Sequence, residues 1–223
     1  MSKLAKVSFA ARHPWDDRFW AVFLATSWLA IAMGFWGPIA RRFGGHANYE
    51  APLILILHVW TYFGWMVLLT IQALLINRRQ VGLHRKLGFA GAALAVLVAG
   101  SGLFAEVFSQ RFWARHDPEN VRFFTFSLFV IIAFSVCAFL AIRARGNPPA
   151  HKRLMLLATI AVLDGPYQRW WGATIDRMTG SGAFNTWAHL LSGWIRCWLR
   201  SPFMIWSRAA RYTVSFASRY HCW

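Results

Sequence analysis

The chain has little charge and very little negative charge. Only 14% of its 223 residues are charged, and just 8 residues are Asp or Glu. Soluble domains carry about 25% charged residues, so this composition argues against a soluble enzyme. Aromatic residues make up 17% of the chain, which excludes a disordered protein because disordered segments contain few aromatics.

The motifs of several common protein classes are also missing. There are three cysteines, and none forms a CxxC, a CxxCH or a Cys/His zinc spacing. These absences exclude a disulfide scaffold, a c-type haem and zinc sites of the usual spacing. The sequence contains neither a P-loop nor a glycine-rich dinucleotide fingerprint. We predict no catalytic residues and expect a protein that is not an enzyme.

Long apolar runs dominate the sequence instead. A helix needs about 20 mostly apolar residues to cross a bilayer, so the chain is predicted to be an all-α, multi-pass transmembrane helix bundle of five or six helices. Residues 1–18 lack the features of a cleavable signal peptide and are expected to be a short cytoplasmic segment, followed by a bundle over residues 19–182. The predicted spans are Phe19–Ala40, Ala51–Ile76, Leu87–Phe108, Phe123–Ile142, Leu154–Trp171 and, interrupted by two arginines, Ala183–Trp206.

The positive charge is distributed unevenly among the loops. Of 24 Lys and Arg residues, 12 lie in the N-terminal segment and the second and fourth loops, 7 in the other loops and 5 in the tail. The positive-inside rule therefore predicts a bacterial inner-membrane protein with a cytoplasmic N-terminus. Six of the eight acids fall on the opposite side. The net charge of +16 is thus interpreted as a sign of topology and of contact with membrane lipids, not of nucleic-acid binding.

Two hairpins of the predicted bundle are related by an internal repeat. Arg78 precedes His84 by six residues, Arg145 precedes His151 by six, and the offset is 67 residues. The repeat predicts a four-helix core, in which His84 and His151 face each other and could ligate one haem iron. On the simpler alternative, the basic residues here only contact lipid headgroups; these are Arg78, Arg79, Arg85, Lys86, Lys152 and Arg153.

A polar stripe crosses the second predicted span. His58, Thr61, Trp65 and Gln72 share one helix face, which must point into the bundle because lipid offers no hydrogen-bond partners. An ionisable residue inside the membrane indicates a functional site, although a single His bonded to a neighbouring helix can also be purely structural. The predicted polar pocket, for a small molecule, a proton or a quinone, contains His58, Thr61, Trp65, Gln72, Glu106, Asp164, Tyr167 and Arg169. A weak metal site or a buried ion-pair network is the alternative.

The fifth predicted span carries an Asp164-Gly165-Pro166 run. Proline removes a helical hydrogen bond and clashes with the preceding turn. The run therefore predicts a broken helix at this point, next to the polar pocket.

The spacing of these motifs resembles that of a known protein family. His58, Trp65, Gln72 and His84 are separated by six, six and eleven residues, and a second motif begins at His151 with the letters HKRLM. The pattern, over about residues 50–165, is similar to that of bacterial polytopic inner-membrane proteins of a domain-of-unknown-function family. The resemblance implies an inner-membrane protein without implying an activity.

A looser resemblance is to transmembrane b-type cytochromes. In those proteins, His pairs on the second and fourth helices and on the third and fifth helices hold two haems. His84 and His151 stand at third-span and fifth-span positions, but the span Phe123–Ile142 contains no His to partner His58. The resemblance therefore implies at most one b-type haem.

The C-terminal part, residues 183–223, differs from the rest. The stretch Trp187–Trp223 holds five arginines and no acid. A frameshift near Thr186 is one hypothesis, because the shifted frame can give a Tyr-Asp-Leu-Val-Thr-Arg-Gly run resembling the family above. The other is a basic amphipathic segment on the membrane surface.

Three functions remain open from the sequence. The first is an inner-membrane protein of unknown molecular activity with the intramembrane polar pocket. The second is a redox protein with one b-type haem between His84 and His151. The third is an accessory or assembly subunit of a bioenergetic membrane complex, with other membrane subunits as partners.

Overall fold

The computed structural model describes residues 16–46, 50–116 and 124–180, together with residues 182, 184, 185 and 188. Within these residues the protein is helical and contains no strand, which confirms the predicted all-α fold. The helices are α1 (Asp16–Phe43), α2 (Leu53–Asn77), α3 (Val81–His116), α4 (Phe124–Arg143) and α5 (Pro148–Thr179), with a 3-10 turn, η2 (Ala144–Gly146), between the last two.

Four of these helices are long and apolar enough to cross a membrane. They are α1, α2, α3 and α4, and each begins or ends beyond the bounds predicted from the sequence. Helix α5 is not apolar enough to join them, so its crossing of the bilayer stays a prediction. The predicted sixth span and the basic tail lie outside the described residues, apart from a few positions before residue 189.

The two hairpins end in different local structures. After α2, Gln80 N–H donates to the Leu75 carbonyl at 2.8 Å and Arg79 N–H to the Ile76 carbonyl at 3.0 Å. This is a Schellman motif, and it places Arg79 at a φ of 59°, where glycine is usual. Before α5, the Asn147 side chain accepts from Ala150 N–H at 3.4 Å, and two prolines follow in the first helical turn.

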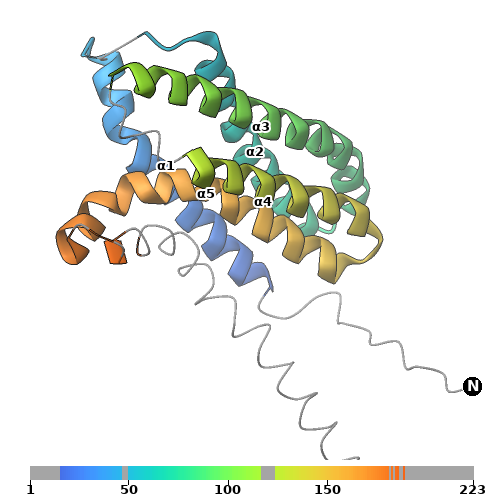
Figure 1. Ribbon diagram of the computed structural model, residues 1–223. Helices are drawn as coiled ribbons and strands as arrows, with labels where there is room; N and C mark the ends of the chain where they lie inside the picture. Colours follow the sequence, from blue (N-terminus) through green and yellow to red (C-terminus); the bar gives the residue numbers. More distant parts are fainter. Residues whose placement is uncertain are drawn as a thin grey trace, which may run out of the picture.

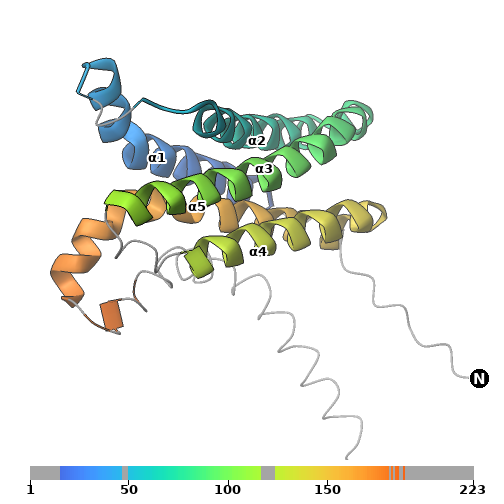
Figure 2. The ribbon, with the colours of Figure 1, turned by 45° about the horizontal axis from the view of Figure 1, so that its top comes forward.

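Both hairpin turns lie at the same end of the bundle (Figures 1 and 2). Helix α2 packs on α3, α3 on α4, and α4 on α5, so the four helices of the two hairpins form one core. Helix α1 packs mainly against α5. The arrangement is the predicted four-helix core with the first helix packed alongside.

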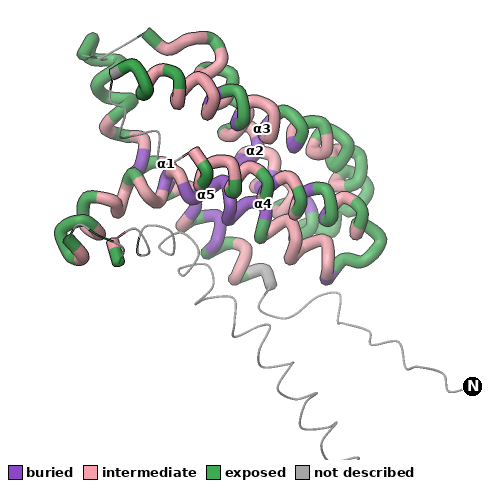
Figure 3. The backbone as a smooth tube through the Cα atoms, viewed as in Figure 1, coloured by how far each residue is buried: buried purple, intermediate pink, exposed green. Residues whose placement is uncertain are grey.

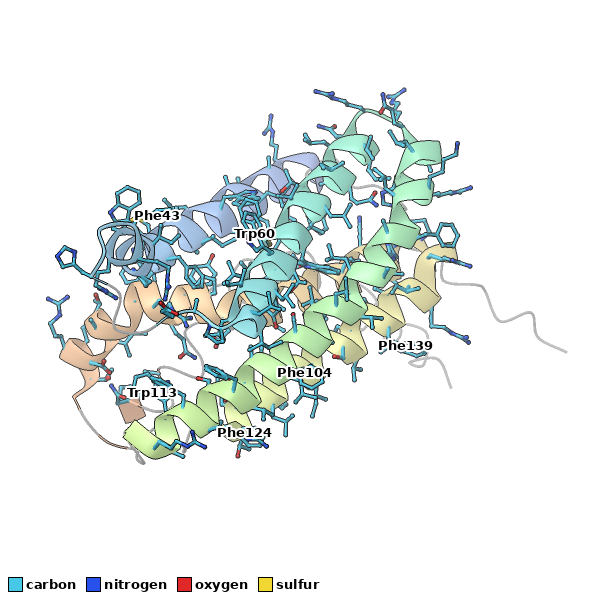
Figure 4. The ribbon with its side chains drawn as sticks, turned by 90° about the horizontal axis from the view of Figure 1, so that it is seen from above. Phe43, Trp60, Phe104, Trp113, Phe124 and Phe139 are labelled. Atoms are coloured by element: carbon cyan, nitrogen blue, oxygen red, sulfur yellow. The ribbon has the colours of Figure 1, made fainter. Side chains whose placement is uncertain are left out.

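The buried residues concentrate on α5 and on the helix faces turned toward it (Figure 3). Residues 158–164 of α5 are all buried, whichever side of the helix they occupy. A segment covered on all sides does not contact lipid, and residues 158–164 therefore do not need the apolar outer surface of α4. Large side chains exposed on the outside, such as Trp60, Phe104 and Phe139 (Figure 4), form the apolar surface that a bilayer would cover.

Helix α5 continues through the Asp164-Gly165-Pro166 run, so the predicted helix break at this run is wrong. Pro166 lacks an N–H and removes one bond of the ladder, but the neighbouring bonds can remain. Gly34 of α1 lies directly against the Pro166 backbone, where even one added methyl group would overlap the Pro166 carbonyl oxygen. Packing between helices thus supports a segment that the local sequence would interrupt.

Candidate functional site

The polar stripe of α2 faces the interior of the bundle, as its spacing predicted. Trp65 is only 3% exposed, whereas the neighbouring residues Val59, Trp60 and Phe63 lie on the outer surface. The stripe crosses the bundle from one end to the other, because His58 and Gln72 are 14 residues, or about 21 Å, apart along the helix. The stripe therefore contributes side chains to the middle of the bundle interior and to both of its ends.

The middle level is tightly packed. The Trp65 indole N–H donates to the Thr159 hydroxyl at 3.3 Å, and its ring meets Phe134 edge-on at 5.0 Å between centroids. Val98 and Leu163 belong to the same core and are almost fully buried. We call Trp65, Val98, Phe134, Thr159 and Leu163 the middle layer. It separates the polar groups at the two ends of the bundle.

A first group of polar side chains lies beyond the middle layer, on the side away from the hairpin turns. The His58 ring packs against Tyr62 at 4.1 Å between centroids, and the charge of Arg169 is close enough to act on His58 electrostatically. Asp164 lies 13 residues, or about 20 Å, along α5 from His151, at about the depth of His58. We call these side chains and their neighbour Gln168 the His58 cluster.

Asp164 is a buried carboxylate, with only 4% of its surface exposed. Gln168 donates to its Oδ2 at 2.8 Å from the next turn of α5. Arg169 lies over the Phe35 ring of α1 at 4.9 Å and donates to the Gly165 carbonyl at 3.3 Å. The cluster thus combines an acid and a basic residue of α5 with an imidazole of α2.

The His58 imidazole has an unused polar atom. Its Nδ1 is buried, and no group of the described residues forms a hydrogen bond with it. More than 90% of buried polar groups in folded proteins have a partner. A buried nitrogen without one is therefore available to a ligand.

The remaining residues of the predicted pocket lie elsewhere. Thr61 shares a 2.7 Å hydrogen bond with Ser101 of α3, and Glu106 accepts from Gln110 of its own helix. Tyr167 packs against the core. Gln72 lies at the opposite end of the bundle, next to His84. The predicted single pocket is therefore divided between two ends.

The second polar group is the His84–His151 pair beside the hairpin turns. The rings are 6.3 Å apart between centroids and nearly perpendicular, at 85°. The His151 Nδ1 is 2.8 Å from the Ala141 carbonyl oxygen, and His84 interacts with the backbone carbonyl of Gln72. The Nδ1 of His84 is buried and has no partner among the described residues.

The ring separation of this pair equals that of two imidazoles on one haem iron. Each metal–nitrogen bond is about 2.0–2.1 Å long. When the distance from each nitrogen to the centre of its own ring is added, two imidazoles on opposite sides of one ion have centroids roughly 6 Å apart. The bond from His151 to Ala141 fixes one ring, as backbone carbonyls do for many metal-binding histidines. Within the described residues no three His, Cys, Asp or Glu side chains come together. A bare ion would therefore lack ligands, whereas a haem brings four nitrogens of its own.

Three side chains of these sites were not selected from the sequence. Tyr62 lies one turn after His58, Ser101 lies between two glycines of α3, and Thr159 lies eight residues after His151. Each contacts a residue of the polar stripe. Hydroxyl groups are common in membrane helices, and a single sequence does not indicate which of them meet a partner on another helix.

No family model, curated protein or solved structure matches the chain. Both resemblances drawn from the sequence therefore stay predictions. The function must be argued from the two polar groups themselves.

Proposed function

We propose that this protein binds a lipid-soluble carbonyl compound of the quinone class at the His58 cluster. The observation that carries the proposal is the buried His58 Nδ1, which has no partner among the described residues. It lies in a bundle of which four helices are long and apolar enough to span a membrane. An intramembrane ionisable residue indicates function, and this one has an unused hydrogen-bonding atom.

The chemistry around His58 favours a quinone over other small molecules. A protonated imidazole Nδ1 donates to a carbonyl oxygen, and the Tyr62 ring, 4.1 Å from His58, provides an aromatic face for a planar ring. Arg169 adds positive charge near the same imidazole, which favours electron-rich oxygens. A quinone also partitions into the bilayer and can reach a site that water does not.

Quenching of tryptophan fluorescence tests this proposal. The protein, reconstituted in lipid nanodiscs, is titrated with decylubiquinone, and we expect saturable quenching beyond that of free tryptophan in the same lipid. The His58→Phe variant should lose the saturable component, because phenylalanine fills the site without a hydrogen-bond donor. The expected loss of affinity is about 5- to 150-fold, since removing the partner of a buried polar group costs about 1–3 kcal/mol.

His46→Phe is the matched control, because His46 is an exposed histidine at the end of α1. It should keep the wild-type binding curve. Equal binding by the wild type and the His58→Phe variant would refute the proposal, provided that both proteins unfold at the same temperature.

A second function is favoured by the His84–His151 pair, with rings 6.3 Å apart. We propose that these two residues hold one b-type haem, which would supply one-electron transfer. The chain's own part is to orient the rings through the Ala141 and Gln72 carbonyls. The nearby basic residues offer partners for the propionate groups.

The absorbance spectrum of the purified protein tests the haem proposal. A Soret band is expected in the wild type and in His46→Ala, and it should be lost in both His84→Ala and His151→Ala. A colourless protein, purified from cells supplied with haem precursor, would rule this function out. The quinone assay is independent of this result, because it probes the opposite end of the bundle.

A further inference from the structure

The end of the bundle that carries the hairpin turns is strongly basic. Residues 76–90 and 140–156 contain eight Lys and Arg residues and no Asp or Glu. Six of the eight are exposed. We call this set the basic end: Arg78, Arg79, Arg85, Lys86, Arg143, Arg145, Lys152 and Arg153. Its charges repel one another unless an anion lies among them.

Helix geometry adds to this positive charge. Helices α3 and α5 both begin at the basic end, and the N-terminus of a helix carries about half a positive charge. The contact between His84 and His151 shows that these two starts lie near each other. Asn147 caps one N–H of α5, and α3 begins with the apolar pair Val81-Gly82.

One basic residue is already positioned over an apolar surface. The Arg145 guanidinium lies 5.9 Å from the centroid of the Phe89 ring of α3. Phe89 is itself 70% exposed, so the arginine does not bury it. The contact places a cation of η2 at the edge of the apolar surface of α3.

Below this contact the surface is apolar. Phe139 and Leu140 of the last turns of α4 are exposed, and α3 and α4 run side by side, with Phe104 and Phe139 on the surface that they share (Figure 4). The surface therefore has cations at its end and hydrocarbon along its length. A free phosphate complements only the first part, and a phospholipid complements both.

We propose that this surface is a binding site for an anionic phospholipid, with the phosphate among Arg143, Arg145 and Arg85 and the acyl chains along α3 and α4. The occupant is a lipid with net negative charge, such as phosphatidylglycerol. A zwitterionic lipid carries its own cation, which the basic end repels. The site does not depend on the quinone or haem proposals, because it uses neither the His58 cluster nor the two histidines of the His84–His151 pair.

Spin-labelled lipids test this site. The full chain is reconstituted in phosphatidylcholine vesicles with a trace of spin-labelled phosphatidylglycerol, and electron spin resonance measures the immobilised fraction. The immobilised fraction of spin-labelled phosphatidylcholine is measured in the same way for comparison. We expect preferential immobilisation of phosphatidylglycerol. In the Arg143→Gln/Arg145→Gln variant this preference should fall by up to about 25-fold, because each of the two basic residues near a membrane surface contributes about a fivefold attraction to anionic lipid.

The matched control is Arg111→Gln/Arg115→Gln, which removes two exposed arginines from the other end of α3. It should leave the preference unchanged. An equal fall in both variants would show that only net charge matters and would overturn the site. Displacement of the labelled lipid by inorganic phosphate, at an ionic strength matched with chloride, would show that the acyl chains do not contribute and would overturn the phospholipid assignment.

Discussion

Helices α4 and α5 pack side by side, yet they differ in composition and burial. Helix α4 is one of the four helices apolar enough to span a bilayer, and α5 is not. However, α4 leaves large side chains such as Phe129, Ile132 and Phe139 exposed, whereas residues 158–164 of α5 are buried without interruption. In a membrane protein, apolar composition therefore reports contact with lipid and not membership of the core.

The difference also explains where the polar chemistry lies. Lipid provides no hydrogen-bond partners, so a helix that contacts it must be apolar on that face. An enclosed helix can hold polar groups that find partners inside the protein: the Ala141 carbonyl of α4 lies beside His151, and Gln168 of α5 itself donates to Asp164. Helix α5 contributes to both candidate sites, and so does α2, whose polar side chains are confined to one face.

The largest expected effect comes from the contact that encloses α5. In Gly34→Val, the new side chain overlaps the Pro166 backbone, and a backbone cannot rotate away. We expect a loss of about 3 kcal/mol of unfolding free energy, the upper end for overpacking, in detergent-induced unfolding followed by circular dichroism. Gly88→Val, at an exposed glycine with open space around it, should change stability by much less. Similar losses in both variants would mean that α1 does not enclose α5.

Two phenylalanines of α4 allow a buried position and an exposed position to be compared within one helix. Phe134 is 1% exposed and packs on Trp65, whereas Phe139 is 61% exposed. We expect Phe134→Ala to cost about 2–3 kcal/mol, below the 3–5 typical of soluble cores, because lipid is as apolar as the core and only packing is lost. Phe139→Ala should cost less than about 0.5 kcal/mol. The same unfolding assay measures both, and a reversed order would contradict the described burial.

A smaller effect is expected from the hydrogen bond that joins α2 to α5. Thr159→Val keeps the shape of the side chain but leaves the Trp65 indole N–H without its acceptor. Interhelical hydrogen bonds in membranes contribute about 0.6 kcal/mol on average and up to about 1.7, so we expect a loss near 1 kcal/mol. Thr125→Val, at an exposed threonine of α4, is the control. If it is as destabilising as Thr159→Val, the bond does not stabilise the bundle.

The sequence predicted the features that depend on long, repeated patterns. The apolar runs identified the helices, and the 67-residue repeat predicted that His84 and His151 would meet. The Asp164-Gly165-Pro166 run misled because it was judged from α5 alone, while its support comes from Gly34, about 130 residues earlier in the chain. The stripe on α2 was likewise taken as one site. A single helix face crosses the whole membrane, and its register with the other helices decides which polar groups it meets.

The His84–His151 contact has a consequence for the origin of the bundle. In a symmetric dimer, a residue near the two-fold axis meets its own copy in the partner. His84 and His151 occupy equivalent places in two hairpins of one chain and lie 6.3 Å apart. They have the relation that a single histidine would have in a dimer of identical hairpins. A hairpin that was duplicated and then fused would retain such a contact between its two equivalent histidines.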